Sequence, residues 1–131
     1  MEIVVKNDDQ GVHKPDIAER TAIFAEQIIR VYRKLEHDGV GRTLGHQLLR
    51  SGTGIGANVQ EAQGGQSKAD FIAKMSIAYK ETRETLYWLR LLKGAISAPN
   101  NNLSDLIIEA NHLARILSSI LITSKKSLKH R

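Results

Sequence analysis

The sequence predicts an all-α fold, an antiparallel up-down-up-down four-helix bundle that forms one domain. Apolar residues recur at alternating intervals of three and four through four long segments, which is the spacing of helices that each bury one face. Short connections separate the segments, and such connections favour antiparallel neighbours. The two prolines, Pro15 and Pro99, stand outside the periodic segments. At 131 residues the chain is long enough to build one well-packed core.

The first helix is expected over residues 15–37, because proline suits a first helical turn and an apolar stripe follows it. Intervals of 4-3-4-3-4 separate the members of this stripe, as in a helix packed in a bundle. The stripe consists of Ile17, Thr21, Phe24, Ile28, Val31 and Leu35. Residues 1–14 are expected to form an N-terminal extension, with at most a short extended stretch at residues 3–5.

The second helix is expected over residues 42–63, and Gly64 and Gly65 end it. Its stripe consists of Leu44, Leu48, Ser51, Ile55, Val59 and Ala62. The string GTGIGA within it has the glycine spacing of a dinucleotide-binding loop. That motif needs a strand before it, and here helical periodicity precedes it, so the sequence disfavours a nucleotide site.

One flank of this second helix consists of residues without side chains. At about 100° per residue, Gly45, Gly52 and Gly56 lie together beside the stripe. Glycines in a helix interior are tolerated where a backbone or a bulky side chain must come close. The sequence leaves open whether that neighbour belongs to the same subunit or to another one in an oligomer.

The opposite flank is polar. It carries Arg50, Asn58 and Glu61, and the third helix offers Glu81 and Glu84 as partners, together with Lys80 and Arg83. Two interpretations remain open: a solvated flank with ordinary ion pairs, or a buried network that fixes the helix register or an oligomer contact.

The third helix is expected over residues 67–96, because Ser67 and Asp70 form a capping-box pattern. Its stripe includes Phe71, Met75, Ala78, Thr82, Leu86 and Leu89. Further apolar residues lie away from that stripe, namely Ile77, Trp88, Leu91 and Leu92. A helix that is apolar on most sides is usually buried on most sides, so these four predict an oligomer face. The alternative is that Trp88 covers one end of the bundle core.

The fourth helix is expected over residues 103–127, capped by Asn102 or Ser104 after a loop that contains Pro99. Its stripe consists of Leu106, Ala110, Leu113, Leu117 and Ile120. Residues 15–124 are expected to form the bundle and residues 125–131 a basic C-terminal tail.

The net charge of +5 and the pI near 9.6 depend mostly on that tail. Four cations without an acidic neighbour lie there: Lys125, Lys126, Lys129 and Arg131. They could make sequence-independent contacts with phosphates of RNA or DNA, to which Arg30, Arg33 and Arg42 could add. Aromatic residues make up 5% of the chain, which argues against recognition of bases by stacking.

The sequence predicts no catalytic residue, no metal site and no cofactor. Glu109 and His112 form one E-x-x-H motif, whereas di-metal bundles use that motif twice, and His112 is expected to face away from the core. Glu81 and Glu84 are typical of ion pairs on a helix surface. There is no cysteine and no uncharged apolar run near 18 residues, so we expect a cytoplasmic protein without a membrane span.

Several of these residues resemble a known family. Those that carry the resemblance are Arg50-Ser51, Ile55, Ala57-Asn58-Val59, Glu61-Ala62, Phe71, Ser76-Ile77-Ala78, Glu81, Glu84-Thr85 and Tyr87-Trp88-Leu89. They are similar to the "four helix bundle protein" family, small bacterial proteins related to those encoded by intervening sequences in large-subunit ribosomal RNA genes. The accessory variability protein of diversity-generating retroelements is similar as well. The family often has Ser or Thr in place of Gly54 and Pro in place of Gly56.

The resemblance covers residues 15–122 and implies a four-helix protomer, ring-like homo-oligomers such as pentamers, an association with nucleic acid and no established enzyme activity. We therefore expect a non-enzymatic, homo-oligomeric binding or scaffolding module for RNA or DNA. The alternatives are a protein-interaction adaptor that does not touch nucleic acid and, less favoured, a cryptic enzyme or cofactor-binding bundle.

Overall fold

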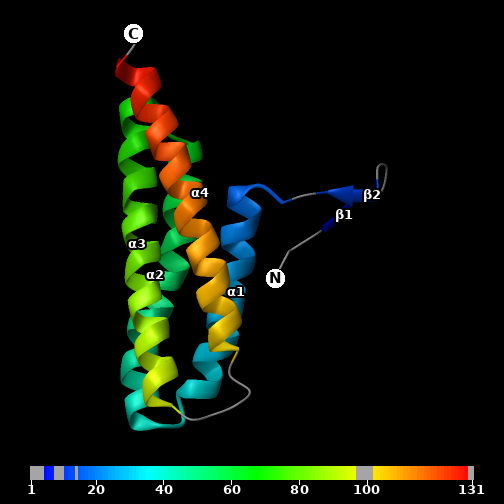
Figure 1. Cartoon of the computed structure of the whole chain (residues 1–131), viewed down its shortest axis with the longest axis vertical. Helices are drawn as coiled ribbons and strands as arrows, with labels where there is room; N and C mark the ends of the chain where they lie inside the picture. The colour runs from blue at the N-terminus through cyan, green and yellow to red at the C-terminus, as the bar shows by residue number, and fades with distance from the viewer. Residues whose placement is uncertain (1–4, 8–10, 14, 97–101, 130–131) are drawn as a thin grey trace.

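A computed structural model describes residues 5–7, 11–13, 15–96 and 102–129. Two short strands, β1 (Val5–Asn7) and β2 (Gly11–His13), pair as an antiparallel hairpin with Val5 opposite His13. Four helices follow: α1 (Ile17–Leu35), α2 (Gly39–Gln63), α3 (Lys68–Ala95) and α4 (Leu103–Lys129). The sequence did not predict this hairpin, which lies beside the start of α1 and away from the other helices (Figure 1).

The helices alternate in direction and form the predicted up-down-up-down bundle (Figure 1). Each helix packs against its neighbours in sequence, and α4 closes the bundle by a smaller contact with α1. The all-α fold is therefore confirmed. Because α1 is the shortest helix, α2, α3 and α4 extend beyond its first turn at one end of the bundle.

The helix starts are set by side-chain caps. Asp16 accepts a hydrogen bond from the backbone N–H of Glu19, and Ser67 accepts one from Asp70, as its capping-box pattern predicted. The start of α2 at residue 42 was wrong. Asp38 caps this helix by accepting from the N–H of Gly41 at 2.8 Å, so α2 begins at Gly39 and α1 ends before residue 37.

The start of α4 matches the prediction, and Asn102 precedes it with a backbone φ of 58°. Its end does not, because the helix continues through Lys129.

By length and composition α4 could cross a bilayer, with a mean hydropathy of 1.4 over 18 residues. In the bundle 33% of that window is buried, and α4 contributes Leu106, Leu113 and Leu117 to the core.

The apolar stripes meet in one core. Its fully buried members include Phe24, Ile28, Leu48, Ile55, Met75, Leu89, Leu113 and Leu117. They come from all four helices, and their alternating spacing in the sequence is what brings them to one interior.

Candidate functional site

The glycine flank of α2 lies against α1 of the same chain. A Cβ atom at Gly45 would stand 2.9 Å from the ring of Tyr32, and one at Gly52 would stand 2.9 Å from Ile28. At Gly56 the nearest atom would be the hydroxyl of Thr21 at 3.3 Å. Of the two interpretations of this flank, the structure shows close packing within one chain. These glycines therefore do not form an exposed oligomer face.

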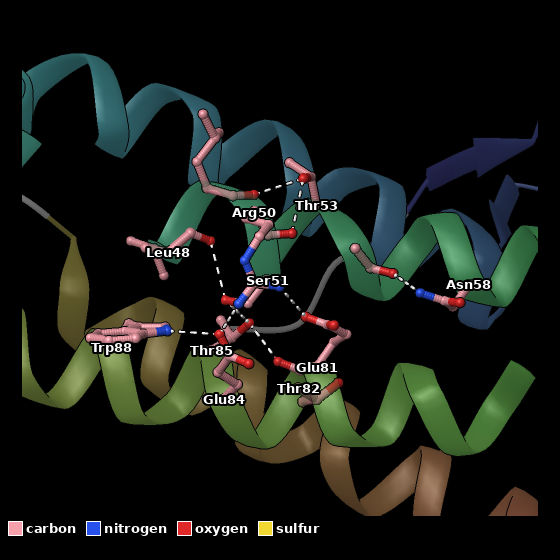
Figure 2. Close-up of polar contacts among 12 residues, drawn as sticks. Leu48, Arg50, Ser51, Thr53, Asn58, Glu81, Thr82, Glu84, Thr85 and Trp88 are labelled. Carbon is pink, nitrogen blue, oxygen red and sulfur yellow. Dashed lines mark hydrogen bonds and ion pairs between the residues drawn. The ribbon is translucent and has the colours of Figure 1, made fainter. Parts of the chain in front are cut away.

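The polar flank faces α3, where one cation meets two carboxylates. The guanidinium of Arg50 forms an ion pair with Glu84, and its Nη1 lies 3.6 Å from Oε2 of Glu81. The carboxylate of Glu84 also accepts a hydrogen bond of 3.0 Å from Nε1 of Trp88. Figure 2 shows these side chains converging from the two helices. The side chain of Arg50 is 55% exposed, so this is a half-buried network at the α2–α3 seam.

A buried hydroxyl pair lies next to this network (Figure 2). The Oγ1 of Thr85 is 2.9 Å from Oγ of Ser51 and 2.7 Å from the carbonyl oxygen of Glu81. Both hydroxyl side chains are fully buried. Because buried hydroxyls need partners, this pair favours one register of α2 against α3.

Asn58 and Glu61 do not belong to the network. Asn58 donates to the carbonyl oxygen of Gly54 in its own helix at 2.8 Å. Glu61 has a side chain that is 62% exposed and lies 3.5 Å from Nζ of Lys74. The five predicted polar residues therefore divide into a network of Arg50, Glu81 and Glu84, a half-buried contact of Asn58 within α2, and an exposed ion pair of Glu61.

The outer face of α3 differs from the predicted one in one residue. Leu92 is fully buried in the core, so its assignment to an outer face was wrong. The reason is that α3 packs on both α2 and α4, which widens its buried arc beyond the stripe through Leu89. Ile77 and Leu91 are exposed, and Trp88 is partly buried against the core.

Sequence reasoning missed a buried ion pair between α1 and α4. Nε and Nη2 of Arg20 donate to the two carboxylate oxygens of Glu109 at 2.7 and 2.8 Å, and Glu109 is 1% exposed. His112 adds its Nδ1 at 3.4 Å from Nη2 of Arg20. The sequence did contain a hint of this pair. Arg20 and Glu109 each directly precede a residue of the apolar stripe, Thr21 and Ala110, so both lie at the edge of a buried helix face.

These groups do not build a metal centre. In the described part of the chain, no three His, Cys, Asp or Glu side chains come together as ligands would. The carboxylate of Glu109 is instead paired with the guanidinium of Arg20.

The C-terminal lysines lie on a helix rather than on a separate tail. Lys125, Lys126 and Lys129 are exposed on the last turns of α4, and none forms an ion pair with a described residue. Arg131 lies outside the described residues. These lysines belong to the end of α4 that extends beyond the start of α1 (Figure 1).

A second group of cations lines an open groove of about 770 Å³ between α1 and the start of α4. Its charged and polar members are Arg30, Arg33, Lys34, His37, Asn102, Asp105 and Gln27. Arg30 lies 3.8 Å from Glu26 of its own helix. The side-chain oxygen of Gln27 is buried and has no hydrogen-bond partner. Arg42, the third cation named from the sequence beside Arg30 and Arg33, is exposed on α2 and does not line this groove.

Comparison with known proteins shows similarity to a protein family and to a solved structure. The model of a family described as 23S rRNA-intervening sequence protein matches residues 13–119. A crystal structure of a protein of unknown function from the S23 ribosomal protein family of Bacteroides thetaiotaomicron is similar, with a TM-score of 0.75 and 36% identity. The match covers 81% of this chain and 98% of that one. No curated protein matches.

Proposed function

The chain belongs to the 23S rRNA-intervening sequence protein family, and from this premise we propose that it is a non-enzymatic, homo-oligomeric bundle that binds nucleic acid. The family membership confirms the resemblance drawn from the sequence. Membership supports the four-helix fold of the protomer but names no ligand, so the proposed ligand rests on the surface of this chain.

The lysine cluster on α4 carries the proposal. Three ammonium groups, those of Lys125, Lys126 and Lys129, stand within five residues on an exposed helix end. No described carboxylate pairs with them, so they remain available to phosphates. Each phosphate that they neutralise would release counterions and make the affinity depend on salt.

Self-association would strengthen such weak contacts. Ile77 exposes 41% of its surface on the first half of α3, which favours a subunit contact there. An oligomer would present one lysine cluster per subunit, and linked clusters bind a long polyanion more tightly than separate ones. We keep the pentamer as the favoured assembly, because the family resemblance implies it.

The proposal is tested by measuring the affinity of the intact protein for labelled 20-nucleotide RNA at several salt concentrations. Replacing Lys125, Lys126 and Lys129 with Gln should weaken binding and lower the slope of log K against log salt. The slope falls by roughly 0.7 per lost phosphate contact on a single strand, so by about 2 for three lysines.

The matched control removes the same charge elsewhere. Lys74, Lys80 and Lys93 are cations of α3 that lie outside both the lysine cluster and the groove beside α1, and their replacement with Gln should change the slope less. Equal losses in both variants would assign binding to net charge instead of the cluster. If the intact protein shows no salt-dependent binding, the nucleic-acid proposal fails and the protein-interaction adaptor takes its place.

A further inference from the structure

The charges of α3 are sorted by sign around the helix. Between Tyr79 and the end of α3, the acidic residues are Glu81 and Glu84, and both turn toward α2 to meet Arg50. Arg83 and Arg90 lie on another side of the helix, four and eleven residues after Tyr79 and therefore on its face. This side of α3 carries cations alone.

The charges of α4 are sorted in a matching way. Its two acidic residues, Asp105 and Glu109, face α1: Glu109 pairs with Arg20, and Asp105 lines the groove beside α1. Arg115 lines an open groove with Tyr79 at the seam between α3 and α4, and it also borders a groove with Asp16 and Arg20 at the start of α1. The outer surface formed by α3 and α4 thus keeps arginines and carries no carboxylate over this stretch.

Arg83 and Arg90 border a second open groove of about 530 Å³ on α3, which Leu86, Tyr87 and Leu91 also line. Neither arginine forms an ion pair with any residue that the structure describes, and the same holds for Arg115. Guanidinium groups that are exposed and unpaired bind phosphate oxygens with two parallel hydrogen bonds.

The ring of Tyr87 stands between these arginines and is 57% exposed. It lies edge-on against Trp88, with ring centroids 4.9 Å apart and planes at 71°. Trp88 is held in turn by Glu84, and Glu84 by Arg50 (Figure 2). An exposed aromatic ring that is already braced loses little conformational entropy when a ligand covers it.

We propose that the Arg83–Tyr87–Arg90 surface of α3 binds single-stranded nucleic acid, with a base stacked on Tyr87 and the flanking arginines on phosphates. Stacking on an aromatic ring requires an unpaired base, since bases in a duplex are already stacked on each other. The low aromatic content of the chain does not oppose this, because one exposed ring is enough for one base. This inference rests on the proposed function and narrows it to the class of nucleic acid.

The test compares a 20-nucleotide single-stranded RNA with a 20-base-pair RNA duplex on the full chain. Tyr87→Ala should weaken single-strand binding by roughly 5- to 100-fold and leave duplex binding within about twofold. Tyr87→Phe keeps the ring and should bind like the unmodified protein. Because Arg83 and Arg90 are exposed, the double variant R83Q/R90Q gives a second measurement that does not depend on how Tyr87→Ala folds, and it should lower the salt slope for the single strand.

The outcomes separate this inference from the proposed function. If the intact protein binds RNA and Tyr87→Ala binds the single strand equally well, the stacking surface is wrong and the proposed function stands. If the intact protein binds neither RNA, both fail. If Tyr87→Ala instead lowers the mass in light scattering, the surface is a contact between copies of the chain, and the inference is overturned.

Discussion

Ile28 of α1 lies directly against the bare backbone of Gly52 in α2. A Cβ atom at position 52 would stand 2.9 Å from Cγ1 and 3.0 Å from Cγ2 of that side chain. Ile28 is completely buried and branched at Cβ, so it cannot swing aside. The spacing between α1 and α2 is therefore set by the absence of a side chain at this position.

Gly52→Ala should destabilise the protein although alanine is the better helix former. Overpacking costs about 1–3 kcal/mol, and the gain in helix propensity offsets up to about 1 kcal/mol of it. Gly54→Ala is the matched control two residues away, because its new Cβ would meet Glu81 at an ordinary 3.5 Å. That control should gain up to about 1 kcal/mol. Urea unfolding gives the free energy of unfolding of both variants. If both free energies change in the same direction, the packing argument is contradicted.

Glu109→Ala should be far more harmful than the loss of an exposed carboxylate. The substitution removes the carboxylate that receives two hydrogen bonds from Arg20, and breaking a buried ion pair costs about 3–5 kcal/mol. Glu26→Ala breaks the exposed contact with Arg30 and should cost less than about 0.5 kcal/mol. The free energies of unfolding, measured side by side, test this difference. Similar values for both would show that the Arg20–Glu109 pair adds nothing to stability.

Glu84→Ala should release the only tryptophan of the chain. The indole N–H of Trp88 loses its acceptor, so its fluorescence emission should move to longer wavelength as water replaces the carboxylate. The free energy of unfolding should fall by only about 1 kcal/mol, because the partner Arg50 is more than half exposed. Glu61→Ala breaks a surface pair with Lys74 and should leave the emission unchanged. If the emission spectrum of Glu84→Ala is not shifted, the hydrogen bond to Glu84 does not hold Trp88 in place.

Ile77→Asp should lower the mass of the assembly. Light scattering after size exclusion should give a multiple of 14.6 kDa for the intact chain and a smaller one for this variant. Ile122→Asp places the same charge on the outer face of α4, at a side chain that is 54% exposed, and should keep the mass. A monomeric intact protein would end the oligomer proposal.

Periodicity alone predicted most of the core. Phe24, Ile55 and Leu113 recur at intervals of three and four, and helical geometry turns such intervals into one buried face. The same geometry placed Gly45, Gly52 and Gly56 on one flank, but it could not say which helix would cover them. That choice depends on how the helices are arranged around the core, which no single segment encodes.

Local sequence did not predict features that depend on contacts between residues far apart in the chain. Nothing near Glu109 shows that Arg20, 89 residues earlier, will occupy it. The exposure of Tyr87 likewise follows from where α2 and α4 leave α3 uncovered. Asp38 is a residue type that often caps helices, and it does so here, so α2 begins three residues before the predicted start at residue 42.

The unequal closure of the bundle has a consequence for the order of folding. Contacts between helices adjacent in sequence form early, because joining them closes only short loops, whereas α4 meets α1 only after most of the chain has been ordered. We expect the Arg20–Glu109 ion pair to form late in folding, after α2 and α3 have already packed together as a helical hairpin. Backbone amides of α1 and α4 should then exchange with deuterium before those of α2 and α3, through partial openings that leave the α2–α3 hairpin intact.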